Sequence, residues 1–179
     1  MQGGLYKRQL HSIEAMSKTD SLHYQLCELG GKYLKSRKNA EPWRTPNKYV
    51  AVELIAAGAE NPDVWATNGY DTSIIEVKTS HSDFLADQKK WVRTKAAEAA
   101  DCQMGNFRYY LCPEGIIKEE ELPDGWGLLV WNGKKIRKVR SATYAKNSAA
   151  MELLMMTSIM SRIAKPQVFN FRKKKEDTK

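Results

Sequence analysis

The sequence has few cysteines, and this excludes two classes of small stabilised fold. Its three cysteines, Cys27, Cys102 and Cys112, are widely spaced and form no Cys-x-x-Cys pair. An odd number of isolated thiols argues against a disulfide framework and against a zinc knuckle. We therefore expect reduced, mostly buried thiols.

The chain also lacks a long apolar run. The segment MELLMMTSIM near the C-terminal end is too short to span a bilayer and contains Thr157 and Ser158. The first residues show no charged start followed by an apolar stretch, so no secretory signal is predicted. We expect a cytoplasmic protein without a membrane partner.

The sequence has fewer acidic than basic residues. The 179 residues include 29 Lys and Arg but 21 Asp and Glu, giving a formal net charge of +8, which favours a polyanionic partner. A chain of this length is expected to fold as one domain that buries about two-thirds of its unfolded surface. We predict a flexible arm at 1–19, the domain at 20–165, and a basic tail at 166–179 that adds weak, salt-sensitive affinity for nucleic acid.

A charged β-hairpin is predicted within NPDVWATNGYDTSIIEVKTSHSDF, residues 61–84. One strand follows the Pro-Asp pair, Asn68-Gly69 supplies the turn, and the returning strand is 73–78. Side chains at i and i+2 share one face of a strand, so Glu76 and Lys78 project together, and Asp63 can meet them across the ladder.

Two carboxylates beside a lysine form a site suited to phosphodiester hydrolysis. Mg²⁺ takes oxygen ligands, usually one or two carboxylates plus phosphate and water. A protonated lysine is not a ligand, but it can orient the attacking water or stabilise charge on a phosphate oxygen, and a neutral one can deprotonate the water. The alternative is a solvated pair of Glu76 and Lys78 on one strand face, with Asp63 merely beginning a strand.

The order Pro62-Asp63, twelve residues, Glu76-Val77-Lys78 resembles the PD-(D/E)XK nuclease superfamily. The resemblance implies that Asp63 and Glu76 are metal ligands, that the main-chain carbonyl of Val77 is another, and that Glu53 supplies a glutamate from the preceding helix. The runs EVKTSHSDFLADQKKW, RYYLCPEG and LPDGWGLLVWNG are similar to the MmcB-like DNA repair proteins and extend the likeness over about residues 48–140.

This resemblance implies an α/β fold, a restriction-endonuclease-like mixed sheet flanked by helices. It also implies a Mg²⁺- or Mn²⁺-dependent nuclease that hydrolyses DNA in repair or recombination. The alternative is a non-catalytic DNA-binding or repair-scaffold protein that retains the nuclease fold. RNA is a third option for the substrate, because no motif here distinguishes it from DNA.

The other elements are predicted from the apolar period, the helix caps and the turn residues; the order of the strands in the sheet stays open. Glu53 falls at the edge of a predicted helix at 45–58, for which a strand at 49–55 is the rival interpretation. The predicted helices are 22–35, 45–58, 83–100 with Ser82 as cap, and 147–165; the predicted strands are 107–112, 127–131 and 135–140.

Basic residues outside the hairpin are candidates for nucleic-acid contacts, although each has a structural alternative. Helix 83–100 would present a ridge that could equally be a solvated face, and strand 135–140 has the lysines typical of a sheet edge. The candidate contacts are Lys89, Lys90, Arg93, Lys135 and Arg137, and the candidate auxiliary residues are Ser80, His81 and Gln88, otherwise ordinary polar residues. The methionine-rich face of the last helix indicates adaptable packing or a homodimer surface.

Overall fold

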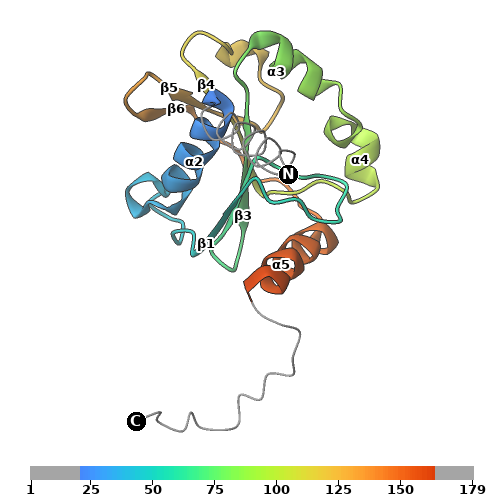
Figure 1. The fold of residues 1–179 in the computed structure, drawn as a ribbon. Helices are drawn as coiled ribbons and strands as arrows, with labels where there is room; N and C mark the ends of the chain where they lie inside the picture. The colour runs from blue at the N-terminus through green and yellow to red at the C-terminus, as the bar shows by residue number, and fades with distance from the viewer. Residues whose placement is uncertain (1–20, 164–179) are drawn as a thin grey trace, which may run out of the picture.

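A six-stranded mixed sheet in the order β1-β2-β3-β4-β5-β6 runs through the part of the chain that the computed structural model describes, residues 21–163 (Figure 1). The predicted arm, 1–19, and the predicted tail, 166–179, lie outside this range. The strands are β1 Tyr49–Val52, β2 Val64–Thr67, β3 Thr72–Val77, β4 Phe107–Pro113, β5 Gly127–Trp131 and β6 Ile136–Arg140. The helices are α2 Leu22–Lys35, α3 His81–Gln88, α4 Lys95–Ala99 and α5 Ala149–Ile163, with short 3₁₀ turns η1 Arg37–Asn39, η2 Trp91–Arg93 and η3 Glu119–Glu121.

The first three strands form an antiparallel meander, and the chain then crosses over through α3, η2 and α4 to place β4 parallel to β3. A second parallel pairing joins β4 to β5, and an antiparallel hairpin adds β6 at the edge. The predictions of an α/β fold, of the hairpin through Asn68-Gly69, and of an edge strand at 135–140 are therefore confirmed.

Helix α2 covers one face of the sheet and has the predicted bounds. The Ser21 hydroxyl caps it by accepting a hydrogen bond from the Tyr24 N–H at 3.2 Å. Gly31 lets the helix approach the sheet closely, because a Cβ there would lie 2.8 Å from a methyl carbon of Val52. Leu26 and Cys27 are fully buried in the core between this helix and the sheet.

The opposite face of the sheet is covered by α3 and α5. Phe84 of α3 and Met155 of α5 are fully buried in one core with Ile74 and Tyr110 of the sheet. Met151 packs against the same core, so the methionine-rich face is used for packing within the chain. A dimer through α5 stays a prediction. No helix between residues 21 and 163 has the length and apolar character needed to cross a membrane.

The predicted helix 45–58 is wrong, and the rival strand is correct. Val50 and Val52 of β1 pair with β2 and pack against the core beneath α2, where β-branched side chains fit a sheet well. This pairing outweighs the helix propensity of the alanines that follow, which is a weak local preference. Glu53 consequently lies just after a strand, with a positive φ of 51°.

The predicted helix 83–100 is also wrong, because the chain forms α3, η2 and α4 as separate pieces. Ser80, not Ser82, caps α3 by accepting from the Asp83 N–H. The Thr94 hydroxyl caps a new helix by accepting from the Ala97 N–H, and this break allows Arg93 to turn inward.

Candidate active site

Three carboxylates occupy one row across three adjacent strands. The ladder pairs Val52 with Val64 and Val64 with Ile75. One step further toward the same end of the sheet, the residue on each chain segment is acidic: Glu53, Asp63 and Glu76. The N–H of Glu53 continues the ladder by donating to the carbonyl of Asp63 at 2.9 Å. Glu53, Asp63 and Glu76 therefore belong to the same end of the sheet.

Asp63 is held in place by two neighbours. Its carboxylate accepts a hydrogen bond from the N–H of Val77 at 2.7 Å and lies 3.5 Å from Nε2 of His23 on α2. The hydrogen bond to Asp63 raises the pKa of His23 above its ordinary value, although burial opposes the shift. The main-chain N–H of Val77 thus lies next to this carboxylate, while the role of the Val77 carbonyl as a metal ligand stays a prediction.

Glu76 and Lys78 project together, as predicted, but into a buried ion-pair network. The Lys78 ammonium lies 3.4 Å from the Glu76 carboxylate and 3.2 Å from that of Asp87. Burial, together with the Asp63 carboxylate, raises the pKa of Glu76 to about 7 in spite of nearby cations. Burial disfavours the charged form of Lys78, but Glu76 and Asp87 outweigh it and raise its pKa.

Arg93 is the centre of this network, so its expected place on a surface ridge is wrong. Its side chain is only 7% exposed and pairs with Glu76 and Asp87, each at 2.9 Å, and with Glu60. The guanidinium also lies over the Trp126 ring, 4.9 Å from its centroid. Arginine suits such a place because its planar fork can serve several carboxylates while remaining charged.

The sequence reasoning missed Glu60 and Asp87. Asp87 is buried and accepts from the Tyr110 hydroxyl at 2.8 Å. Burial alone would raise the pKa of Asp87, but Arg93 and Lys90 outweigh burial and hold that pKa well below its ordinary value. Glu60 accepts from the N–H of Met104 at 2.8 Å. Their sequence positions give no signal of these contacts, because the partners come from other segments of the chain.

A mixed cluster shares Glu53 and Asp63 with the carboxylate row and adds His23 and Cys27, which the sequence reasoning missed. His23, Cys27, Glu53 and Asp63 each offer a ligand atom, and these atoms lie within 4.8 Å of one another. Burial and the Asp63 and Glu53 carboxylates raise the pKa of the Cys27 thiol well above its ordinary range. One sequence signal was available: His23 and Cys27 are four residues apart in the predicted helix 22–35, and residues at that spacing share one face of a helix.

The remaining basic candidates are on the surface, but not all are near the row. Lys89 and Lys90 are exposed after α3, and the Lys90 ammonium lies 2.7 Å from the Asp87 carboxylate. Lys135 and Arg137 are exposed at the β6 edge, at the opposite side of the sheet from β1. A shared role of all four in binding stays a prediction.

The three auxiliary candidates have structural partners around α3. Ser80 is the helix cap, His81 lies 2.7 Å from the Glu121 carboxylate, and Gln88 donates to the Glu121 carbonyl at 3.1 Å. These contacts account for the polar side chains by tying α3 to the turn η3.

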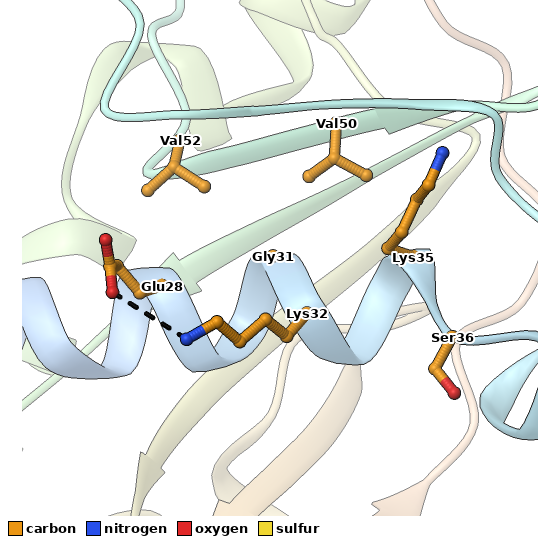
Figure 2. A pocket seen from close by; sticks show the side chains of 7 residues that line it. All are labelled: Glu28, Gly31, Lys32, Lys35, Ser36, Val50 and Val52. Carbon is orange, nitrogen blue, oxygen red and sulfur yellow. Dashed lines mark ion pairs between the residues drawn. The ribbon is translucent and has the colours of Figure 1, made fainter.

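An open groove of about 440 Å³ runs between α2 and β1 (Figure 2). Its apolar side is formed by Val50, Val52 and Gly31, while Lys32 and Lys35 add positive charge. The groove also includes Glu28, which follows Cys27 directly, and Val52 precedes Glu53. The groove therefore leads along both elements toward the mixed cluster.

No protein-family model matches the chain, and no curated protein matches it. A solved structure of a protein of unknown function from Silicibacter pomeroyi is similar to it, with 22% sequence identity and a TM-score of 0.46. The similarity covers 64% of this chain and 75% of that one. It supports no argument about function, which has to be inferred from the residues themselves.

Proposed function

We propose that this protein is a metal-dependent nuclease that hydrolyses DNA phosphodiester bonds, as the resemblance to the PD-(D/E)XK superfamily and its MmcB-like branch implies. The observation that carries the proposal is the row of Glu53, Asp63 and Glu76, with Lys78 two residues beyond. Carboxylates and a lysine at one end of a sheet are the groups that such hydrolysis requires.

The donor set is suitable for a divalent cation. Asp63 and Glu53 would hold it, because their side chains are 21% and 43% exposed and each is paired with the His23 imidazole, not with a lysine or arginine. A Mg²⁺ or Mn²⁺ ion bound there would lower the pKa of a bound water and neutralise phosphate charge. Glu76 would join as a ligand only by exchanging its contact with Arg93.

Lys78 would act as a cation in this reaction. Its raised pKa favours the protonated form, so the side chain serves to orient water or to stabilise charge on a phosphate oxygen, not to remove a proton. Asp87 and Glu76 fix the position of its ammonium, which limits the reorganisation needed during the reaction.

The groove in Figure 2 offers a path for a strand of the substrate. Lys32 and Lys35 could contact phosphates, while Val50 and Val52 could contact a sugar or base. These contacts would carry no sequence information, so we expect weakly specific or structure-directed binding. RNA could use the same contacts.

A second function, a non-catalytic DNA-binding scaffold, is favoured by one observation. Glu76 and Lys78 are only 3% and 4% exposed, and both are satisfied by ion pairs within the chain. Such a network could serve stability alone, as many buried ion pairs do not act in catalysis.

The experiment that tests the proposal measures cleavage of labelled single-stranded, duplex and branched DNA, and of RNA, with Mg²⁺, Mn²⁺ or EDTA. The variants are Lys78→Met and Asp63→Asn, with Lys146→Met, at a side chain that is 83% exposed, as a surface control purified identically. We expect metal-dependent cleavage by the wild type and the control, and a loss of at least about 100-fold in both site variants. Thermal unfolding checks that each variant is folded.

Two results would overturn the nuclease proposal. One is cleavage that is equal in the wild type and in folded Asp63→Asn, which would indicate a contaminating enzyme. The other is DNA binding without cleavage under every metal and substrate, which would support the scaffold function.

A further inference from the structure

The mixed cluster beside the carboxylate row has donors that Mg²⁺ does not use. Mg²⁺ is bound through oxygen, whereas an imidazole nitrogen and a thiolate sulfur suit Zn²⁺ and Co²⁺. Here His23 and Cys27 come from one face of α2, and Glu53 comes from the end of β1. The chain thus adds nitrogen and sulfur to a site that carboxylates alone could serve.

The separations of these donors match those of a tetrahedral site. Nδ1 of His23 lies 3.6 Å from Sγ of Cys27 and 3.6 Å from Oε1 of Glu53, and that Sγ lies 3.2 Å from the same Oε1. Zinc bonds of about 2.0–2.3 Å place neighbouring tetrahedral ligands roughly 3.3–3.6 Å apart. Two of the three separations fall within this range and the third, from Sγ to Oε1, is slightly shorter, so the three atoms form a triangle close in size to one tetrahedral face.

Asp63 occupies the place of a supporting group for this triangle. Its carboxylate lies 3.5 Å from Nε2 of His23, the ring nitrogen that faces away from the other donors. A carboxylate that accepts the second imidazole N–H fixes the tautomer and leaves the first nitrogen free to bind a metal. The hydrogen bond from Val77 in turn holds Asp63.

The cluster is also accessible from one side. Cys27 is fully buried, while the side chains of His23 and Glu53 are 37% and 43% exposed. An ion can enter past the two exposed ligands and meet the thiol at the base. The thiol donates a hydrogen bond to the Glu53 carboxylate, and on metal binding it releases this proton to solvent and binds as the thiolate. Three protein ligands leave a fourth tetrahedral position that water or substrate can occupy.

We infer that His23, Cys27 and Glu53 bind a transition-metal ion of the Zn²⁺ and Co²⁺ class, with Asp63 as the residue that positions the histidine. The inference rests on the proposed function only in that it concerns the ion used at the same site: Glu53 stays a ligand, while Asp63 positions His23 in place of binding the ion itself. It predicts that this cluster prefers Zn²⁺ or Co²⁺ to the Mg²⁺ or Mn²⁺ that the family resemblance implies, because oxygen-only coordination would leave His23 and Cys27 unused.

Co²⁺ is the probe, because a cysteine thiolate bound to it gives a charge-transfer band in the near ultraviolet. The purified full chain, free of metal, is titrated with Co²⁺ in the absence and presence of excess Mg²⁺. We expect one ion per chain, the thiolate band, and no displacement by Mg²⁺. Zn²⁺ should displace the bound Co²⁺ and abolish the band.

Three variants make the test specific. Cys27→Ser should lose the band, and His23→Gln, at a half-exposed position, should weaken Co²⁺ binding by at least about 10-fold. Cys102→Ser changes a thiol outside the cluster and should retain both the band and the affinity. Urea unfolding confirms that the variants are folded.

The inference is overturned if Co²⁺ does not bind, if it binds without a thiolate band, or if Mg²⁺ displaces it as readily as Zn²⁺. Equal Co²⁺ affinity in the wild type and in folded His23→Gln would also overturn it. These failures are distinct from failure of the proposed function. A chain that cuts DNA with Mg²⁺ alone and shows no thiolate band is a nuclease without this ion, whereas a chain that shows the band and never cuts binds the ion without being a nuclease.

Discussion

Replacing Arg93 with methionine should destabilise the protein strongly, because it leaves three buried carboxylates with less countercharge. The guanidinium pairs with Glu60, Glu76 and Asp87 while its side chain is 7% exposed. Removing one partner of a buried ion pair costs about 3–5 kcal/mol, since the remaining charge has lost both water and partner. We therefore expect Arg93→Met to lower the free energy of unfolding by about that amount.

The destabilisation should depend on pH with a definite sign. Without Arg93, the pKa values of the buried carboxylates rise in the folded protein, so folding of the variant takes up protons. The loss of unfolding free energy relative to the wild type is then largest above pH 7, where the carboxylates would be charged, and it shrinks as the pH falls and they take up protons. The pKa of Glu76 is already raised to about 7 in the wild type. A cavity or a packing defect would instead give the same deficit at every pH.

Urea unfolding followed by circular dichroism, at about pH 8 and about pH 5.5, measures both quantities. The matched control is Lys90→Met, because Lys90 also pairs with Asp87, at 2.7 Å, but is 56% exposed. An exposed partner contributes little, so this control should cost less than about 1 kcal/mol. An Arg93→Met deficit below about 1 kcal/mol, or one that does not change between the two pH values, would show that Arg93 does not stabilise the buried carboxylates.

Three further predictions concern packing, a buried acid and the groove. Gly127→Ala should lower the free energy of unfolding by about 1–3 kcal/mol in urea unfolding, because its Cβ would lie 2.4 Å from a ring carbon of Tyr109; an unchanged midpoint would contradict this. Glu152→Gln should cost about 1–3 kcal/mol in the same assay, because an amide NH₂ would meet N–H and O–H donors that the carboxylate now accepts from; a cost near zero would contradict it. The double variant Lys32→Glu, Lys35→Glu should weaken DNA binding in fluorescence anisotropy and reduce the slope of log affinity against log salt by about 2; an unchanged slope would exclude the groove as a phosphate contact.

The elements that could be predicted from the sequence are those with strong local signals. Helix 22–35 has an apolar period and a serine cap, and the hairpin of β2 and β3 has alternation and an Asn-Gly turn. The segments 45–58 and 83–100 could not be predicted correctly, because their structure depends on distant partners. Val50 and Val52 form a strand since β2 is beside them. The chain after Ser80 breaks into α3, η2 and α4, and Arg93 at the end of η2 turns inward to its carboxylate partners.

The site shows the same division between local and distant information. Side-chain alternation was enough to place Glu76 beside Lys78, and the hairpin placed Asp63 next to them. Asp87 and Glu60 could not be identified, because an isolated acidic residue is ordinary until its cation is known. That cation is Arg93, which lies 33 residues from Glu60 along the chain, and only folding brings the two groups together.

Glu53 has a left-handed backbone conformation that lowers the stability of the folded chain, although the proposed metal site needs a carboxylate at this position. A φ of 51° is easy for glycine and tolerable for asparagine, but it costs a glutamate on the order of 1 kcal/mol. Selection of a mutant library for thermal stability alone should therefore enrich glycine or asparagine at this position. Selection for metal binding should retain a carboxylate. The difference between the two enrichment profiles would mark Glu53 as a residue kept for its chemistry, even before the substrate is identified.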